Sequence, residues 1–185
     1  MPLSKNKLDH SDSDRILTAA FFDRAALKVA SDLIGCRLHW SDGDQTQSHI
    51  ITETEAYIGA QDLASHASKG RTKRTEAMFG PPGTLYVYFV YGMHWMLNVV
   101  TGPVGYPAAV LIRSVEGISG PGRLTRALGV TGKLNGQTAE RETGLWLSEA
   151  QRPERSQIIA TPRIGVAYAG GEWANKPYRF ILTSE

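Results

Sequence analysis

Two glutamates separated by one residue offer the clearest chemistry in the sequence. Glu53 and Glu55 fall near the end of an alternating, β-branched segment over 49–54 that predicts a strand. Alternate residues of a strand point to the same face, so the two carboxylates are expected about 6.6 Å apart along it. Carboxylate pairs at such separations hydrolyse glycosidic bonds, where one of them activates water. Two exposed glutamates on an edge strand are the alternative interpretation.

A tyrosine-rich strand is predicted over 84–91, where Tyr86, Tyr88 and Tyr91 precede Gly92. A second apolar run over 95–100 follows, so the two predict a hairpin with Tyr91 at its tip. Flat aromatic faces suit stacking on a nucleobase, although packing in the core is the commoner use of such rings. A large ring at a tip is poorly placed for burial and is typical of a wedge that unstacks a duplex.

Basic residues gather in two segments, 66–80 and 113–133. Each has a net charge of +3 in a chain whose total is +2, which leaves −4 for the remainder. This asymmetry favours a polyanionic partner, and solvated basic loops are the alternative. Carboxylates, aromatic rings and basic loops together indicate cleavage of a glycosidic bond in nucleic acid. The residues expected on the DNA backbone are Arg71, Lys73, Arg74, Arg123 and Arg126.

Length and composition limit the other classes of protein. With 185 residues, 42% apolar and 21% charged, the chain predicts one globular domain over 14–185 and a disordered polar tail over 1–13. No apolar run of about 18 residues is present, and no secretory signal pattern is seen at the N-terminus. Cys36 is the single cysteine and is expected to be a small buried residue in an intracellular protein.

Motifs for metals and nucleotide cofactors are missing from the sequence. The five histidines show no HExxH pairing, and no CxxC occurs. Neither GxxxxGK[ST] nor a GxGxxG that opens a helix after a strand is found. We therefore expect no metal and no cofactor.

Two helices are predicted to flank the strands. The first begins at Asp23 as its cap and ends at Gly35, with Leu27, Ala30 and Ile34 at helical spacing. The second opens at the Gly-Pro-Gly-Arg segment over 120–123 and ends near residue 128. Between them, a Gly-, Ser- and basic-rich loop over 59–83 includes one helical turn near 62–68, and loops of this length are usually functional.

The predicted fold class is α/β (α+β). It is a single compact domain with a mostly antiparallel curved sheet, flanking helices and a protruding β-hairpin. Residues 131–144 are expected to form a polar loop. The remaining strands are predicted over 36–40, 109–115, 146–147, 158–160, 164–167 and 179–182.

Several motifs over residues 15–183 resemble the alkyladenine (3-methyladenine, methylpurine) DNA glycosylase family. The resemblance implies a DNA repair enzyme that flips alkylated or deaminated purines (3-methyladenine, 7-methylguanine, hypoxanthine) out of DNA and hydrolyses their N-glycosidic bond, leaving an abasic site. The matching segments are Thr54-Glu55-Ala56-Tyr57, Asp62 with His66, Met78-Phe79, Pro82-Gly83-Thr84-Leu85-Tyr86-Val87-Tyr88, Tyr91-Gly92-Met93, Asn98, Gly120-Pro121-Gly122-Arg123-Leu124, Arg163-Ile164-Gly165-Val166 and Gly171-Glu172-Trp173-Ala174.

The resemblance also implies roles for individual residues. Glu55 matches the general base that activates water, and Arg113 the residue that helps hold this water and a deoxyribose phosphate. Ile164 matches the position whose backbone carbonyl orients the water. The base pocket is matched by Tyr57 and His66 on one wall, by Tyr88 on the opposing face and by Asn98 at the exocyclic edge. Tyr91 and Met93 match the residues that enter the DNA.

The expected partner is double-stranded DNA with damaged purines, bound by a monomer that contacts no membrane. The expected location is intracellular, in the cytoplasm or nucleoid of a bacterium or the nucleus of a eukaryote. The bulky segment over 93–97 departs from the family pattern and bears on the lesion range. The segments over 101–108 and 170–171 differ from it in length and bear on the DNA contacts, and the loop over 101–108 also bears on the substrate range. A non-catalytic binder of damaged or single-stranded nucleic acid is the alternative. A carbohydrate hydrolase would instead show tryptophan platforms and no basic loops.

Overall fold

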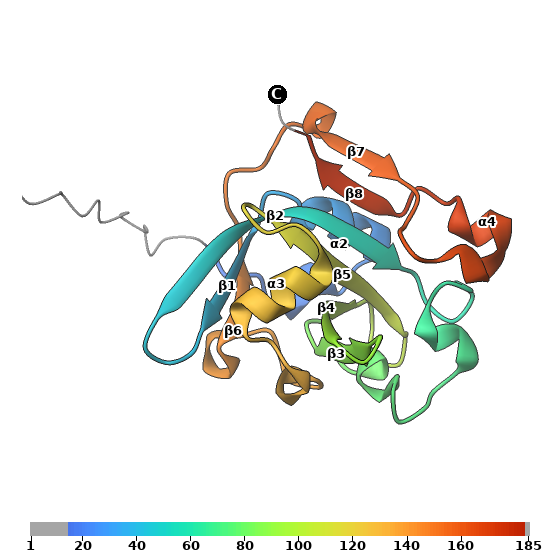
Figure 1. The fold of residues 1–185 in the computed structure, drawn as a ribbon, viewed down its shortest axis with the longest axis horizontal. Coiled ribbons are helices and arrows are strands. Elements are labelled where there is room, and N and C mark those ends of the chain that lie inside the picture. Colours follow the sequence, from blue (N-terminus) through green and yellow to red (C-terminus); the bar gives the residue numbers. More distant parts are fainter. Residues whose placement is uncertain (1–14, 184–185) are drawn as a thin grey trace, which may run out of the picture.

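The computed structural model describes residues 15–183, so the tail predicted over 1–13 lies outside the described residues. Within this range the strands form an antiparallel sheet in the order β3-β4-β5-β2-β1-β6, and β8 pairs with both β2 and β7 (Figure 1). The predicted fold class is confirmed. The strands are β1 (Arg37–Ser41), β2 (Thr46–Tyr57), β3 (Leu85–Val90), β4 (His94–Thr101), β5 (Ala108–Val115), β6 (Leu145–Ser148), β7 (Ile158–Thr161) and β8 (Arg179–Leu182).

The long strand β2 lies in the interior of the sheet and has three neighbours. Its first half pairs with β1, whereas residues 51–57 pair with β5 and residues 53–55 also pair with β8. The register shifts on both sides of Glu53, as at a β-bulge, which bends a strand and re-aims its side chains. The interpretation of Glu53 and Glu55 as edge-strand residues is therefore wrong, because both edges of β2 are paired at these positions.

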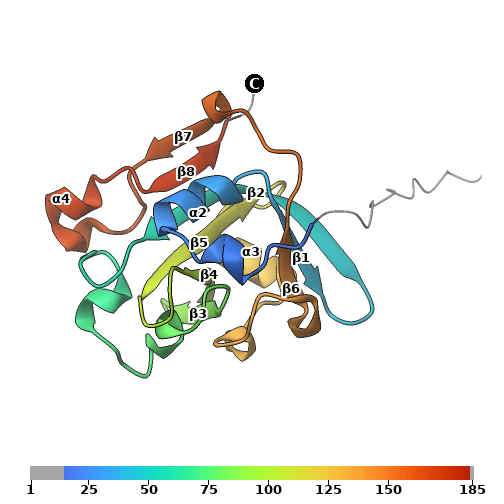
Figure 2. The same ribbon diagram turned by 180° about the vertical axis from the view of Figure 1, so that it is seen from behind.

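Helices cover both faces of the sheet. α2 (Ala26–Leu33) packs on β2, β5 and β8, and α3 (Pro121–Leu128) packs on β4 and β5 from the other side, as the opposite views of Figures 1 and 2 show. The short helices α1 (Ala19–Phe22) and α4 (Gly170–Ala174) complete the set of α-helices in residues 15–183. Leu33, Ile112 and Leu124 belong to one buried cluster that joins both helices to the sheet.

The first predicted helix is present but begins later than expected. Its buried residues Ala26, Val29, Ala30 and Leu33 follow the i, i+3, i+4, i+7 pattern of an amphipathic helix. Asp23 is not its cap: this residue instead ends α1, and Ala25 stands at the N-cap of α2. The predicted end is confirmed, because helix α2 stops at Leu33, just before Gly35, whose positive φ of 87° suits glycine.

The prediction of a strand over 164–167 is wrong. Residues 164 and 165 form a bend that leads into a short 3-10 helix, Ala167–Ala169, and then into α4, which was not predicted. The apolar alternation of this segment resembles a strand. However, Gly165 has a positive φ of 75°, and the N–H of Ile164 donates to the side chain of Glu55 rather than to a strand partner.

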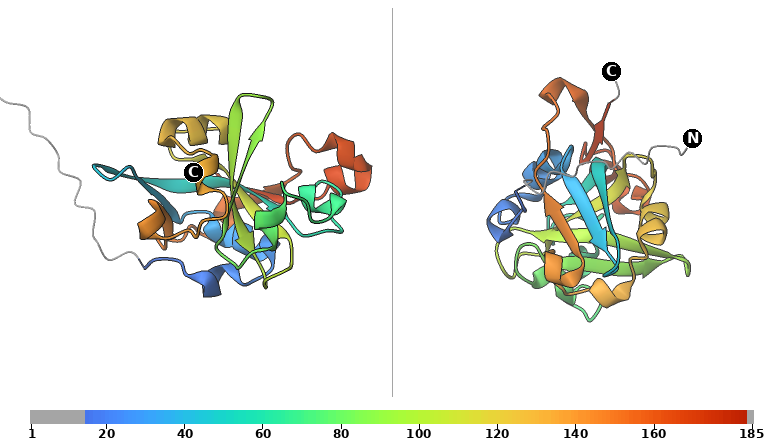
Figure 3. Two further views of the ribbon diagram at one scale, coloured as in Figure 1. Left: turned by 90° about the horizontal axis from the view of Figure 1, so that it is seen from below. Right: turned by 90° about the vertical axis from the view of Figure 1, so that its left-hand side faces the viewer.

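The β3–β4 hairpin stands out from the body of the molecule, on the same side as α3 (Figure 3, left). The residues before it, 59–83, form the long loop that the sequence predicts, with 3-10 turns at His66–Lys69 and Glu76–Phe79. The polar segment over 131–144 also holds only short 3-10 turns, Gly132–Leu134 and Arg141–Thr143. The hairpin and the 59–83 loop thus flank the end of β2 that carries Glu55.

Candidate active site

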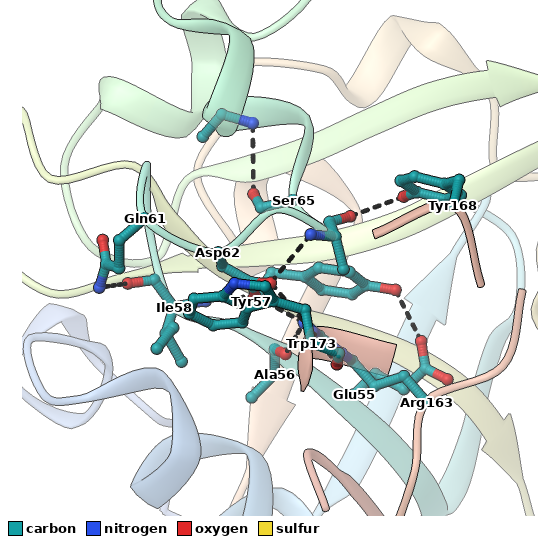
Figure 4. Close-up of polar contacts among 12 residues, drawn as sticks. Glu55, Ala56, Tyr57, Ile58, Gln61, Asp62, Ser65, Arg163, Tyr168 and Trp173 are labelled. Atoms are coloured by element: carbon teal, nitrogen blue, oxygen red, sulfur yellow. Dashed lines mark hydrogen bonds and ion pairs between the residues drawn. The ribbon is translucent and has the colours of Figure 1, made fainter. Parts of the chain in front are cut away.

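The carboxylate of Glu55 is fully buried and held by three donors. The hydroxyl of Tyr57 donates to its Oε2 over 2.8 Å, and the backbone N–H of Ile164 donates to its Oε1 over 2.8 Å. The Nη1 atom of Arg113 lies 3.2 Å from the same Oε1. Figure 4 shows Glu55 and Tyr57 in this arrangement. The carboxylate therefore has a fixed orientation that is set by β2, β5 and the segment after β7.

Glu53 lies beside Glu55 and meets the same guanidinium group. Its Oε1 accepts from Nε of Arg113 and from Nη1 of Arg179, each over 3.0 Å, and its Oε2 accepts from the hydroxyl of Ser114 over 2.6 Å. Because one arginine contacts both carboxylates, Glu53 and Glu55 share a face of β2, as the spacing predicts. Neither is an exposed surface glutamate: the Glu53 side chain is only 14% exposed.

An aromatic pocket with about 320 Å³ of free space, part of it open to solvent, adjoins Glu55. Tyr57 belongs both to this pocket and to the hydrogen-bonded group around Glu55, which places the carboxylate at the edge of the pocket. The four residues predicted for a base pocket all line it. The lining is formed by Tyr57, Ala64, Ser65, His66, Met78, Tyr86, Tyr88, Asn98, Ala109 and Tyr168.

His66 lies across the pocket in an environment that disfavours its charged form. Burial lowers its pKa to about 4, and the nearby cations Arg74 and Lys69 act in the same direction. Its Nδ1 lies 3.0 Å from the Tyr86 hydroxyl, and its ring meets Tyr88 edge to face at 4.6 Å. His66 is therefore neutral at pH 7 and presents an uncharged ring to the pocket.

Two further pocket side chains are fixed by their neighbours. The amide nitrogen of Asn98 donates to the backbone carbonyl of Tyr86 over 3.0 Å, which orients an amide that is only 3% exposed. Burial and the adjacent Glu55 raise the pKa of Tyr57 well above its usual value, so its phenol stays protonated and remains a donor. The pocket thus has polar groups in set positions on aromatic walls.

A buried ion pair of Asp62 and Arg163 was missed from the sequence as a functional element. The two side chains make two hydrogen bonds, of 2.6 and 2.9 Å, and Nη1 of Arg163 also donates to the carbonyl of Ala56 over 2.9 Å. The guanidinium lies over the ring of Tyr57 at 4.8 Å and over that of Tyr178 at 5.2 Å. Figure 4 shows Arg163 with Asp62 and Tyr57. The pair joins the pocket loop to the residue that precedes Ile164.

Tyr168 was also missed. Its ring lines the pocket although it is 69% exposed, and its hydroxyl donates to the carbonyl of Ala64 over 2.7 Å (Figure 4). This bond links the turn after Ile164 to the 59–83 loop. The only signal in the sequence is an aromatic residue four positions after Ile164, directly after the segment over 164–167 that the alternation assigned to a strand.

The tip of the β3–β4 hairpin presents apolar side chains to solvent. Tyr91 is 79% exposed and Met93 61% exposed. Tyr91 is the single non-glycine residue with a positive φ among residues 15–183, at 54°, and Gly92 follows with a φ of 66°. Such a conformation costs a tyrosine free energy, and conformations of this kind concentrate at functional sites. The tip therefore holds a large ring where asparagine or glycine would be more stable.

The predicted DNA-backbone residues lie in two places. Arg71 makes an exposed ion pair with Glu76, Lys73 is exposed beside it, and the guanidinium of Arg74 lies 5.4 Å from the Tyr88 ring. Arg123 and Arg126 are exposed on α3. Arg74 is thus the cation of this set that reaches the pocket.

Residues 15–183 contain no group of three or more His, Cys, Asp or Glu side chains that could hold a metal ion. Over the same range, no helix has the length and apolar character needed to cross a membrane. Cys36 is buried, as predicted, and burial raises its pKa to about 12.

A fixed carboxylate beside an aromatic pocket, below a projecting aromatic tip, is typical of hydrolases that excise bases from nucleic acid. The methylpurine-DNA glycosylase family model matches residues 20–119 and 117–185. The chain belongs to the methylpurine-DNA glycosylase family. It is a DNA repair glycosylase, a hydrolase of N-glycosyl bonds whose substrate is alkylated DNA.

Relatives from bacteria and an archaeon match along most of their length, and each carries the name "Putative 3-methyladenine DNA glycosylase". The protein of Myxococcus xanthus is 46% identical over 172 residues, which are 88% of this chain and 88% of the relative. The protein of Legionella pneumophila (strain Corby) is 43% identical over 175 residues, which are 91% of this chain and 94% of the relative. The protein of Methanocella arvoryzae is 44% identical over 185 aligned positions, which cover 89% of this chain and 91% of the relative.

Proposed function

We propose that this glycosylase excises purines made cationic by alkylation, of the 3-methyladenine and 7-methylguanine class, with Glu55 as the general base. The observation that carries the proposal is the buried Glu55 carboxylate, held by three donors at the edge of the aromatic pocket. The names of the relatives support the lesion class.

The reaction is the hydrolysis of one bond. The oxygen of water attacks C1′ of the deoxyribose, and Glu55 takes a proton from that water. The bond from C1′ to N9 breaks, and its electron pair neutralises the positive charge of the alkylated purine. Because the base departs as a neutral molecule, the leaving group needs no acid. The products are the free base and an abasic site.

Arg113 and Ile164 support Glu55 in this proposal. The guanidinium of Arg113 orients the Glu55 carboxylate and adds positive charge near the deoxyribose phosphate. The N–H of Ile164 orients the same carboxylate, while its backbone carbonyl is proposed to accept from the attacking water. A carboxylate and a carbonyl then both contact the water, which directs its lone pair at C1′.

The pocket residues are proposed to select the base. Tyr57 and His66 form one wall and Tyr88 the other, so that a cationic purine is drawn between electron-rich rings. The neutral His66 adds no repulsion to a cationic base. Asn98 lies at the exocyclic edge with its amide fixed by Tyr86. Hypoxanthine is neutral and needs protonation as it leaves, so we propose that it is excised more slowly.

The hairpin tip and the basic residues are proposed to hold the DNA. Tyr91 fills the gap that the flipped nucleotide leaves, with Met93 beside it. Arg71, Lys73, Arg74, Arg123 and Arg126 neutralise phosphates on either side. We also propose that the enzyme acts as a monomer inside the cell and makes no strand nick.

The substitution Glu55→Gln tests the proposal. It keeps the shape of the side chain but removes its basicity, so single-turnover excision of 7-methylguanine from a duplex should fall by about 10²–10⁴-fold. Lesion binding should be retained, and alkali should reveal abasic sites with the parent enzyme alone. Excision within about threefold of the parent would overturn Glu55 as the base. Strand cleavage without alkali, or a borohydride-trapped adduct, would overturn the hydrolytic mechanism.

A further inference from the structure

Glu53 is a nearly buried carboxylate that the proposed reaction does not use. It is surrounded by donors from two strands: Arg113 and Ser114 of β5, and Arg179 of β8. In the sheet, Glu53 pairs with Ser114 of β5 on one side of β2 and with Ile181 of β8 on the other. A carboxylate with three donors inside a sheet is a built arrangement, and its closest functional neighbour is Glu55.

The guanidinium of Arg113 contacts both Glu53 and Glu55 and so links their positions. Its Nε lies 3.0 Å from Glu53 Oε1, and its Nη1 lies 3.2 Å from Glu55 Oε1. Because a guanidinium is rigid and planar, fixing the direction of Nε also fixes the direction of Nη1. Without the contact to Glu53, Arg113 loses one of the two ion pairs that fix its guanidinium.

The charges at this place balance. Glu53 and Glu55 supply two negative charges, and Arg113 and Arg179 supply two positive ones within ion-pair distance. An additional cation near Glu55 stabilises its ionised form and weakens it as a base, whereas an additional anion does the opposite. The other titratable groups that face Glu55 are Tyr57 of β2, Tyr88 of β3, Arg163 and Tyr168.

We propose that Glu53 is a positioning residue for base excision: it aligns Arg113 on Glu55 and, with Arg179, sets the basicity of the Glu55 carboxylate. This inference rests on the proposed role of Glu55 as the general base. Ser114 has a different part, because its hydroxyl accepts from the N–H of Gly120 over 3.1 Å and donates to Glu53. Ser114 ties the start of α3 to Glu53 without any charge.

The acid limb of the pH–rate profile is the measurement that reports this role. We would follow single-turnover excision of 7-methylguanine, whose base is already cationic and does not need protonation. The variant Glu53→Gln leaves one uncompensated cation, so the limb should move to lower pH by about one unit. A weaker base also slows the plateau rate by about threefold to tenfold.

The variant Arg179→Gln should act in the opposite direction and move the limb up by about one pH unit. The double variant Glu53→Gln/Arg179→Gln restores the charge balance and should return the limb to within about 0.3 units of the parent. Ser114→Ala is the matched control, since it removes a hydrogen bond to Glu53 but no charge, and its limb should coincide with that of the parent.

The outcomes separate this inference from the proposed function. If Glu55→Gln is inactive but neither Glu53→Gln nor Arg179→Gln moves the limb, Glu53 has only a structural role and the inference is overturned. If Glu55→Gln stays active, the proposed function itself fails. Should Glu53→Gln not fold, as judged by circular dichroism, Glu53→Asp keeps the charge and must show the parent limb, while Arg179→Gln must still move it upward.

Discussion

At the scale of single residues, the site is built from polar groups that lie inside the protein with their partners. Asp62 and Arg163 have side chains with no exposed surface, and they connect the pocket loop to Ile164. Arg71 and Glu76 form the same kind of ion pair at the surface, with side chains about 60% exposed. Burial decides how much each pair contributes, because water screens the outer pair and leaves the inner pair without an alternative partner.

The variant Asp62→Asn should therefore be strongly destabilised. It leaves the charge of Arg163 buried without its counter-ion, which typically costs about 3–5 kcal/mol. Urea unfolding followed by circular dichroism measures the loss. The matched control Glu76→Gln breaks the exposed pair and should unfold at the parent midpoint. Equal midpoints for the two variants would show that Asp62 and Arg163 do not anchor the loop.

The low pKa of His66 gives the second prediction at this scale. The unfolded chain binds a proton to this histidine below a pKa of about 6.5. The folded protein binds it only below about 4. Stability from this group is therefore present above pH 6.5 and is lost as the pH falls toward 4. Between pH 7 and pH 4.5, the free energy of unfolding should fall by about 1–2 kcal/mol less in His66→Gln than in the parent. This magnitude is discounted for the partial exposure of His66.

Denaturant titrations of both proteins at the two pH values measure this difference. The control is His49→Gln, which changes a histidine on β2 outside the pocket. Parallel losses of stability in the parent and in His66→Gln would contradict a depressed pKa at His66.

At the scale of elements, the β3–β4 hairpin carries a ring in an unfavourable conformation. Tyr91 and Gly92 both have positive φ values, and Met93 donates its N–H to the carbonyl of Val90 over 3.2 Å. Two central residues with positive φ match a type I′ turn, which favours Asn-Gly. The exposed ring thus contributes little to folding, and the proposed contact with DNA would give it a function at the tip.

Tyr91→Asn should separate stability from function. Asparagine adopts positive φ more readily than tyrosine, so the variant should be about 0.5–1 kcal/mol more stable than the parent in thermal unfolding. Lesion binding and excision should weaken, and the defect should shrink when a mismatch opposite the lesion already loosens the pair. Met93→Ser is the control for stability. A destabilised Tyr91→Asn with a defect that ignores the opposite base would contradict the wedge.

At the scale of the whole molecule, the two faces of the sheet differ in what they present. α3 and the β3–β4 hairpin project from one side, and α2 covers the other (Figures 2 and 3). Arg123 and Arg126 are exposed on the first side, and Lys28 is exposed on α2. A duplex that contacts the hairpin tip and the pocket would meet α3 rather than α2.

DNA binding should accordingly depend steeply on salt. If about four phosphates are neutralised, the plot of log K against log salt should have a slope of about −3 to −4. Arg126→Gln should reduce the slope by about one, whereas Lys28→Gln, the same change of charge on the α2 side, should leave it unchanged. A slope flatter than about −1, or equal effects of the two variants, would remove α3 from the DNA contacts.

Local patterns in the sequence were sufficient for most of the elements. The alternation over 49–54, the tyrosine-rich run before Gly92 and the Pro-Gly opening at Pro121 predict β2, β3 and α3, because each depends on residues close in the chain. The same holds for the shared face of Glu53 and Glu55 and for the exposed tip at Tyr91. Propensity and periodicity act over a few residues, and these features need no more.

Only the tertiary structure decided which distant residues meet. The pairing of β2 with both β5 and β8 brings Glu53 to Arg113 and Arg179, which lie 60 and 126 positions further along the chain. Ile164 lies in a bend where a strand was predicted, and its N–H donates to the carboxylate of Glu55 on β2. Sheet register and buried charge pairing are determined by the packing of the whole chain, and no local segment contains that information.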